Sequence, residues 1–259
     1  MARSLANSRS PLGSVPLATP TLSFADWPRT MPNGASAVAA AKVRERTSMY
    51  ITVANRRSTV HRSEYLEWFH SVHIPEKLAR PGYRWAAHYL LSPDNSGETN
   101  YLALFGGDSA YTFLNPSPRQ LLTRQTPETK RFMTMRRGAS AWIFTQAVRV
   151  DGGSPARDAD AAPAIVLQVF NTQDAIAEDE TGAWLAQEMF PAFARSSACV
   201  RARALVATVG THKHAWLLEF TSNAAREQTP PTAAGLKAAL LQAPRSPMTG
   251  ERIWPPLPA

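Results

Sequence analysis

Two stretches of the chain decide the expected fold: Glu64-Tyr-Leu-Glu-Trp-Phe-His-Ser-Val-His-Ile-Pro75 and Glu180-Thr-Gly-Ala-Trp-Leu-Ala-Gln-Glu-Met-Phe-Pro191. Both open on Glu and carry a Trp seven residues before a Pro, and the second lies 116 residues after the first. At this offset, segments 49–105 and 165–221 share few identities but similar hydrophobic classes. Because Trp is rare, the paired Trp and Pro carry the argument. The period is that of a small domain, so the pattern predicts a tandem duplication.

The remaining sequence fits this division. Residues 1–47 are rich in Ser, Pro and Ala and lack periodicity, which predicts an irregular N-terminal arm. Segment 48–150 forms the first half, 151–163 has the composition of a linker, and 164–259 forms the second half.

Hydrophobic periodicity predicts the same order of strands and helices in both halves. The first half is expected to contain strands at 49–56, 84–91, 100–105 and 139–150, a helix at 63–79 and helical pieces within 108–137. The second half is expected to contain strands at 164–171, 199–209, 215–221 and about 252–254, with helices at 179–196 and 232–242. Each half is then a β-α-β-β-α-β unit, the ferredoxin-like arrangement. Helices on one face of each sheet leave the other face bare. The predicted fold class is α+β, with two ferredoxin-like halves pairing their antiparallel sheets into a barrel around a cavity.

Composition excludes several function classes. The chain has 259 residues, 44% of them hydrophobic, and its one cysteine, Cys199, excludes a disulfide framework and a cysteine-based zinc site. The net charge of +8 comes from dispersed arginines without a nucleic-acid-binding motif, so no nucleic-acid partner is expected. The start does not resemble a signal peptide, and no apolar run approaches the roughly 18 residues of a membrane span. We therefore expect a cytoplasmic protein without a membrane partner.

On these features the sequence resembles the dimeric α/β-barrel superfamily, and within it most closely the EthD-type branch. The resemblance rests on strand 49–56, the helix segment Tyr65–Pro75 with its aromatic-His-Ile-Pro ending, and the turn at Pro81-Gly82. It covers 49–150 well and 164–254 weakly. Members of this superfamily hold small aromatic or polyketide-like substrates in the barrel. They include cofactor-independent monooxygenases, cyclases, dehydratases and decarboxylases, haem-binding relatives, and proteins with no known reaction. The resemblance is also compatible with a homodimer of this chain.

The first copy of the helix motif carries ionisable side chains that the second lacks. His73 matches the family's helix histidine, so the resemblance implies a general acid/base, and an imidazole suits that role near neutral pH. The alternative is a helix histidine that hydrogen-bonds a carbonyl. His70 lies on the same side of the helix and would support His73, while a metal-binding pair lacks an evident third ligand. Met189 occupies the corresponding place in the second half. His214 is expected in a solvated turn.

Strand alternation predicts which side chains face the barrel interior. One face of strand 199–209 carries Arg203, and the offset of 116 aligns Glu219 with Ala103 on the neighbouring strand. The expected cavity wall is aromatic in the first half and polar in the second: Tyr50, Trp85, Tyr89 and Tyr101, then Gln168, Arg203 and Glu219. Arg203 would bind a carboxylate or enolate, with Glu219 orienting it or acting as a base. Alternatively, Arg203 and Glu219 form a structural ion pair and the aromatic residues are ordinary core. His88 falls on the helix-facing side.

The favoured function is a cofactor-independent enzyme acting on a small hydrophobic, aromatic or polyketide-like molecule. Proton transfer by His73 in the barrel cavity would drive a lyase-type step, namely dehydration, decarboxylation or cyclisation. One alternative is a cofactor-independent monooxygenase in the same cavity. Another is a non-catalytic small-molecule-binding or stress protein. No metal and no cofactor are expected.

Overall fold

The computed structural model describes residues 47–56, 62–93, 99–153, 161–229, 236 and 239–257. The expected N-terminal arm lies outside the described residues except for Thr47, as does the middle of the expected linker. No helix among the described residues is long and apolar enough to cross a membrane.

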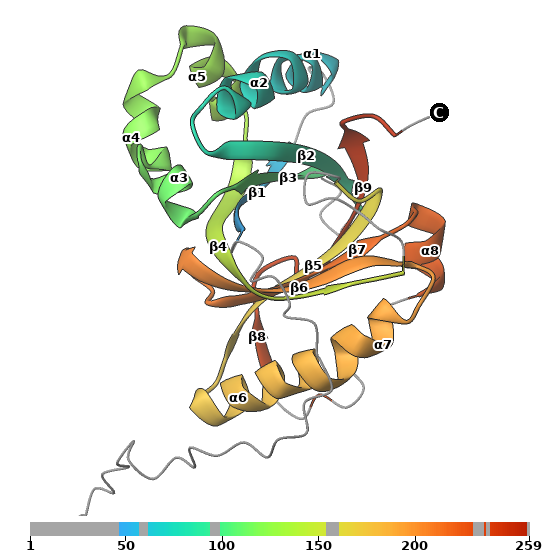
Figure 1. Ribbon diagram of the computed structural model, residues 1–259. Helices are drawn as coiled ribbons and strands as arrows, with labels where there is room; N and C mark the ends of the chain where they lie inside the picture. Colours follow the sequence, from blue (N-terminus) through green and yellow to red (C-terminus); the bar gives the residue numbers. More distant parts are fainter. Residues whose placement is uncertain are drawn as a thin grey trace, which may run out of the picture. The chain divides into compact units, whose positions relative to one another are not determined.

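Eight antiparallel strands of the described chain close into a barrel (Figure 1). Their order around the ring is β7-β6-β4-β1-β3-β2-β9-β5, and pairing of β5 with β7 closes it. The strands are β1 (Ser48–Arg56), β2 (Tyr83–Leu91), β3 (Thr99–Gly107), β4 (Arg137–Asp151), β5 (Ala164–Thr172), β6 (Cys199–Val209), β7 (His214–Phe220) and β9 (Met248–Trp254). The fold is therefore an α+β barrel, as the sequence predicts.

The strand order is the same in the two segments of the chain. The strands of 48–151 lie in the order β4-β1-β3-β2, and those of 164–254 in the order β9-β5-β7-β6. Antiparallel pairing of β4 with β6 and of β2 with β9 joins the two sets. Because β4 is 15 residues long, its first part pairs with β1 and its second part with β6.

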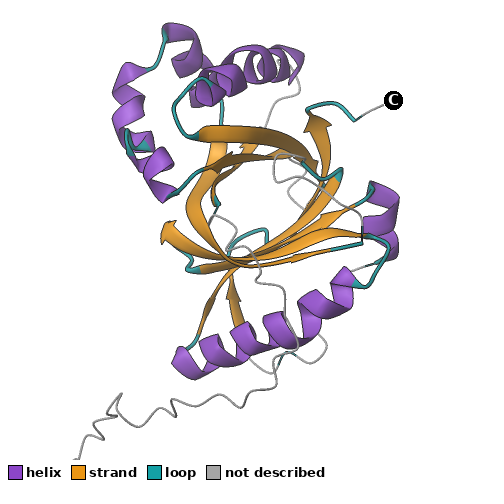
Figure 2. Ribbon diagram, in the orientation of Figure 1, coloured by secondary structure: helices purple, strands orange, loops and turns teal. Residues whose placement is uncertain are grey.

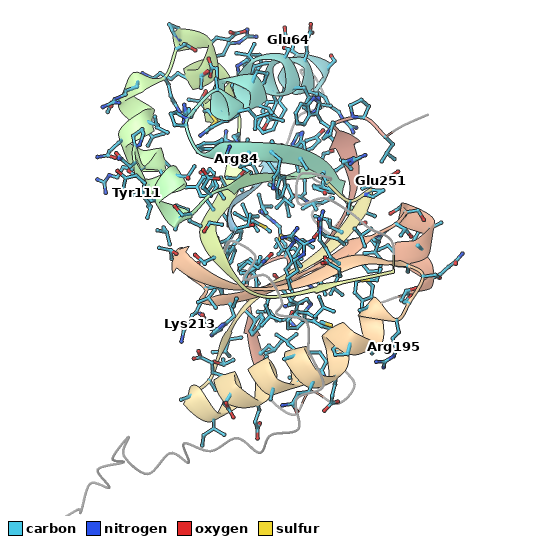
Figure 3. The ribbon with its side chains drawn as sticks, in the orientation of Figure 1. Glu64, Arg84, Tyr111, Arg195, Lys213 and Glu251 are labelled. Atoms are coloured by element: carbon cyan, nitrogen blue, oxygen red, sulfur yellow. The ribbon has the colours of Figure 1, made fainter. Side chains whose placement is uncertain are left out.

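Alternate side chains of the strands fill the barrel. The interior cluster is mainly aliphatic and aromatic, with Ile51 on β1, Leu104 on β3, Leu167 on β5 and Leu217 on β7 almost fully buried. Side chains project into the barrel from the surrounding strands (Figure 3). The opposite faces of the strands pack against helices, and two further clusters form there. Most strands are consequently buried on both faces, which removes the alternation of polar and apolar residues from their sequences.

The helices lie on the outside of the barrel in two groups (Figure 2). The first group begins with α1 (Arg62–Trp68), a π-helical turn η2 (Phe69–His73) and α2 (Ile74–Leu78). The second begins with α6 (Ala175–Trp184), a π-helical turn η4 (Leu185–Met189) and α7 (Phe190–Ala194). Asp174 caps α6 by accepting a hydrogen bond from the Ala177 amide at 2.8 Å.

Both π-helical turns directly follow the paired Trp and directly precede the residue before the paired Pro. In each turn the amide of the next residue bonds a carbonyl five residues back, from Ile74 to Phe69 and from Phe190 to Leu185. Pro75 and Pro191 follow at the start of α2 and α7. The backbone stays helical through the residues before each proline, so each π-helical turn and the α-helix after it form one continuous helical segment.

The other helices are short. They are α3 (Ala110–Leu114), α4 (Pro118–Leu121), the 3-10 turn η3 (Leu122–Arg124), α5 (Pro127–Thr134) and α8 (Asn223–Gln228). The helix predicted over 232–242 is wrong at its end, because Leu240–Gln242 form strand β8 and pair with β5. Most of 230–238 lies outside the described residues.

The constant offset of 116 residues fails at the third strand of each segment. In the first segment Leu90 pairs with Tyr101, and in the second Val206 pairs with His214. Val206 follows Leu90 by 116 residues, whereas His214 follows Tyr101 by only 113. The connection between β6 and β7 is therefore three residues shorter. The predicted alignment of Glu219 with Ala103 is wrong.

Candidate functional site

His73 lies on the helix-covered outside of the barrel and not in its interior. It ends the π-helical turn η2, and its ring packs against Trp68 at 4.9 Å and Phe69 at 5.1 Å between centroids. The side chain is buried, and no described residue forms a hydrogen bond with its Nδ1. Burial lowers the pKa of His73 to about 2, with further lowering by nearby cations. The imidazole is consequently neutral at physiological pH.

Three cationic side chains surround His73, and we call these four residues the His73 cluster. They are Lys77 on α2, Arg80 in the following turn and Arg136 just before β4, and each lowers the pKa of His73. Lys77 is only 8% exposed, and burial with the two arginines lowers its pKa to about 8. Buried nitrogens of Arg80 and Arg136 also have no hydrogen-bond partner among the described residues. Lys77 is buried and the two arginines are half-buried, and a group of cations that is only partly neutralised in this way favours the binding of an anion.

Tyr50 connects the His73 cluster to a small cavity. The Lys77 ammonium lies 5.6 Å from the centre of the Tyr50 ring, within range of a cation–π contact. The same tyrosine lines a cavity of about 250 Å³ together with side chains of α3, α4, β4 and β6. The prediction that Tyr50 faces the barrel interior is wrong, because its ring packs on Phe105 and Phe113 beneath the helices.

His70 and His88 form a separate pair. His70 Nε2 lies 2.9 Å from His88 Nδ1, and the centre of the buried His88 ring lies 4.3 Å from that of Phe69, with the two rings tilted. Burial lowers the pKa of both histidines, and the proximity of His70 lowers that of His88 further. The helix-facing position predicted for His88 is confirmed. His70 is thus bound to β2, and its predicted support of His73 stays a prediction.

Tyr101 and Gln168 also lie on the helix-covered side, against prediction. The Tyr101 ring is 5.3 Å from that of His88 and 6.1 Å from that of Tyr65. Gln168 is opposite Trp216 in the β5–β7 ladder and is buried in the outer layer of the second segment. Because β1, β3 and β5 are buried on both faces, their sequences do not show which face is interior.

Four of the predicted cavity residues do face the barrel interior. Trp85 and Tyr89 belong to the interior cluster, and the Tyr89 hydroxyl donates to the Ala162 carbonyl at 3.0 Å. Arg203 and Glu219 meet there, with Arg203 Nε 2.8 Å from a Glu219 oxygen. Whether these residues bind a substrate stays a prediction.

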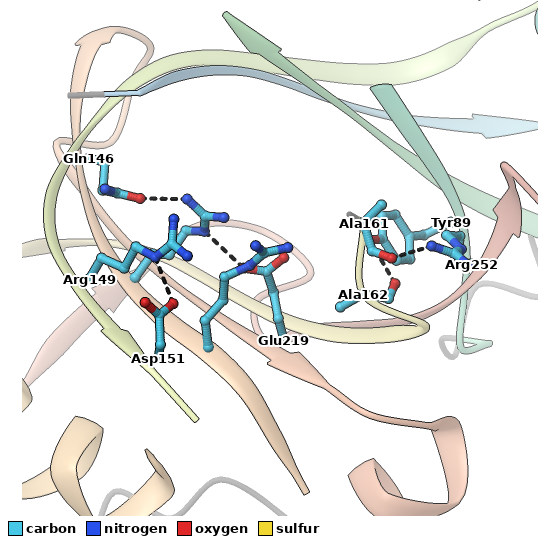
Figure 4. A network of polar contacts seen from close by, with 10 residues as sticks. Tyr89, Gln146, Arg149, Asp151, Ala161, Ala162, Glu219 and Arg252 are labelled. Atoms are coloured by element: carbon cyan, nitrogen blue, oxygen red, sulfur yellow. Dashed lines mark hydrogen bonds and ion pairs between the residues drawn. The ribbon is translucent and has the colours of Figure 1, made fainter. Parts of the chain in front are cut away.

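Glu219 is the centre of a buried charged network in the barrel (Figure 4). Arg201 Nε contacts the same carboxylate oxygen at 2.6 Å, and Arg203 also donates to Gln146. Burial alone would raise the pKa of Glu219, but the two arginines outweigh it and lower the pKa. Arg149 and Asp151 form a further ion pair at 2.7 Å nearby. These mutual contacts favour the structural alternative for Arg203 and Glu219.

A larger cavity, which we call the second-half cavity, lies between α6 and strands β5, β6 and β7. Its volume is about 640 Å³. Its walls are mostly apolar, and Glu178 and His214 supply polar groups. His214 Nε2 lies 3.5 Å from Glu178 Oε1, and the His214 ring stacks 5.6 Å from Phe170. Sequence reasoning missed this site because it assigned His214 to a solvated turn. The run of small residues Thr181-Gly-Ala183 on the helix was the signal that could have revealed it.

Metal ligation and cysteine chemistry find little support in the described residues. No group of three or more His, Cys, Asp or Glu side chains in the described ranges is arranged to hold a metal ion. Burial raises the pKa of Cys199 to about 12, which leaves its thiol protonated and unreactive.

Comparison with known proteins supports the fold but does not assign the chain to a family. No family model and no curated protein matches the sequence. Among solved structures, an anthrone oxidase-like protein aligns over 81% of this chain and 92% of its own, with 10% identity and a TM-score of 0.57. A candidate monooxygenase from Fusobacterium nucleatum aligns over 81% and 93%, with 7% identity and a TM-score of 0.51. At these identities the likeness shows a shared α+β barrel fold.

Proposed function

We propose that this protein is an enzyme that acts on a small hydrophobic, anionic molecule by proton transfer at His73. The observation that carries the proposal is the His73 cluster itself: a buried neutral imidazole beside three cations, with the Glu76 carboxylate offsetting only part of the charge at Lys77. The site lies beneath α2, so the proposal moves the chemistry from the barrel interior to the helix-covered face of the first segment.

The chemistry follows from this arrangement of charges. An anionic substrate would be attracted to Lys77, Arg80 and Arg136, and its apolar body would extend past Tyr50 into the cavity of about 250 Å³. Once the anion offsets the cations, the pKa of His73 rises and the imidazole becomes a better base. His73 Nδ1 would then accept a proton from a carbon next to a carbonyl group. Lys77 and Arg136 would stabilise the resulting enolate.

A lyase-type step without a cofactor fits this proton transfer. The proton that His73 takes from carbon can pass to a leaving hydroxyl in a dehydration, or to the alkoxide formed when the enolate attacks a second carbonyl in a cyclisation. In a decarboxylation the loss of carbon dioxide itself forms the enolate, and a protonated His73 would supply the proton to carbon. We further propose that the protein belongs with the EthD-type branch, on its helix motif and barrel. We also propose a tandem duplication, supported by the equal strand order and by the π-helical turns at equivalent positions.

Solvent exchange tests the proposed proton abstraction whichever product the reaction forms. The full chain is incubated in deuterated buffer with a panel of aryl β-keto acids, and exchange of the hydrogens between the carbonyls is followed by proton NMR against an enzyme-free control. We expect His73→Gln to lower the enzyme-dependent rate by about 10²-fold or more. His212→Gln, in the β6–β7 turn, is the control and should exchange like the parent protein. Equal exchange by the parent protein and His73→Gln would assign the base to another residue.

A further inference from the structure

We propose that the second-half cavity binds a small, neutral, ring-bearing molecule with one hydroxyl group. The cavity lies on the opposite set of helices from the His73 cluster and shares no residue with it. The inference is therefore independent of the proposed proton transfer at His73.

The cavity exists because large side chains of the first segment have small counterparts in the second. Tyr65 and His88 correspond, 116 residues on, to Thr181 and Ala204, and both small residues line the cavity. In the first segment the rings of Tyr65, Phe69 and His88 pack against one another, with Tyr65 5.6 Å and His88 4.3 Å from Phe69. These positions between helix and sheet are therefore filled by rings in the first segment and border a cavity in the second.

Gly182 marks the centre of this difference. It lines the cavity from α6, and a Cβ atom added to it would meet no atom within 4 Å among the described residues. Its counterpart in the first segment is Leu66, which packs at the edge of the first helix-covered cluster. A glycine inside a helix costs about 1 kcal/mol relative to alanine. Gly182 is exposed, so this open space lies at the mouth of the cavity, and a glycine there leaves the mouth accessible to a ligand.

The walls of the cavity define the body of the ligand. Phe170, Leu185, Leu205 and Val148 are apolar, and half of the remaining lining residues are alanine or valine. A volume of about 640 Å³ lies within the range of roughly 300 to 1,000 Å³ that small-molecule sites occupy. These walls suit an apolar ring system, which would lose unfavourable contact with water on binding.

The polar side chains of the cavity indicate which functional group the ligand carries. Both oxygens of Glu178 lie 2.7 Å from the Lys213 ammonium, and Asp179, the second carboxylate of the lining, is exposed to water, so neither carboxylate calls for a cationic ligand. Burial lowers the pKa of His214, and its side chain is only 14% exposed. A neutral imidazole at the edge of an apolar cavity can exchange a hydrogen bond with a hydroxyl group, and it offers no charge to a carboxylate.

Binding of three related probes to the full chain tests the proposal. The probes are 2-naphthol, naphthalene and 2-naphthoate, and binding is measured by fluorescence titration and ligand-observed NMR. We expect 2-naphthol to bind best and 2-naphthoate worst. Gly182→Leu, which copies Leu66, should weaken 2-naphthol binding by about tenfold or more because the added side chain would obstruct the mouth of the cavity, and it should raise the melting temperature because it removes a helix glycine. His214→Phe should weaken binding of 2-naphthol but not of naphthalene.

Gly153 supplies the matched control. It also has no atom within 4 Å of an added Cβ, but it follows β4 and lies outside the cavity lining, so Gly153→Leu should bind like the parent protein. The proposal is overturned if the parent protein binds no probe at millimolar concentration or if Gly182→Leu binds 2-naphthol as well as the parent. Tighter binding of 2-naphthoate than of 2-naphthol would overturn the assignment of a neutral ligand.

Discussion

Replacing His73 with methionine, the residue at the corresponding position 189, should make the protein more resistant to acid. In the folded protein, burial and the three surrounding cations lower the pKa of His73 to about 2. In the unfolded chain the same imidazole titrates near about 6.5. The folded pKa is depressed, so as pH falls below 6.5 the unfolded chain binds a proton that the folded protein does not. The folded state therefore loses stability progressively down to about pH 2.

The size of this loss follows from the pKa difference. Each pH unit below the unfolded pKa costs the parent protein about 1.4 kcal/mol at this site, so the loss between pH 7.5 and 4.5 is about 2.7 kcal/mol. The His73→Met variant cannot take up this proton. Its unfolding free energy relative to the parent should rise by about 2 to 3 kcal/mol over the same interval.

Urea denaturation of both proteins at pH 7.5 and 4.5, followed by tryptophan fluorescence, measures this difference. Leu78→Met on α2 is the control, because it alters packing nearby but removes no titrating group, and its difference from the parent should not change with pH. A difference between His73→Met and the parent that also stays constant with pH would show that His73 is protonated in the folded state. The reasoning about the His73 cluster would then fail.

Three further changes test the barrel interior and the ion pair at the edge of the second-half cavity. Glu219→Gln should lower the unfolding free energy by about 3 to 5 kcal/mol, measured by urea denaturation, because it leaves two buried guanidinium groups without their shared carboxylate. Gly106→Ala should cost about 1 to 3 kcal/mol and alter the tryptophan fluorescence, because the added Cβ would overlap the Trp85 ring. Lys213→Gln should change the melting temperature by only a few degrees, because its exposed ion pair with Glu178 is worth at most about 1 kcal/mol.

Several parts of the fold are local enough to predict from the sequence. The paired Trp and Pro predicted two equivalent helices, and the structure has both, each with a π-helical turn at the same place. Alternation on β2 and β6 correctly placed Trp85 and Arg203 in the barrel interior. On β6 the arginines alternate with small apolar residues, so the two faces of that strand differ in chemistry.

The positions of Tyr50, Tyr101 and Gln168 could not be predicted in the same way. Their strands are apolar on both faces, since one face packs inside the barrel and the other beneath helices. Tyr101 was also misplaced by the constant offset of 116 residues between the two segments. The β6–β7 connection is three residues shorter than the β2–β3 connection, and an odd shift exchanges the two faces of the aligned strand.

The sequence by itself determined the order of the elements, the barrel class and the asymmetry between His73 and Met189, because these depend on local periodicity and residue identity. Only the tertiary structure decided which side chains meet around the proposed site. His73 is beneath α2 with Lys77, Arg80 and Arg136, which are brought together from separate segments of the chain by packing. The second-half cavity likewise arises from volumes missing on α6 and β6 at once. A charge cluster or a cavity depends on several residues that are distant in sequence, and only the folded chain brings those residues together.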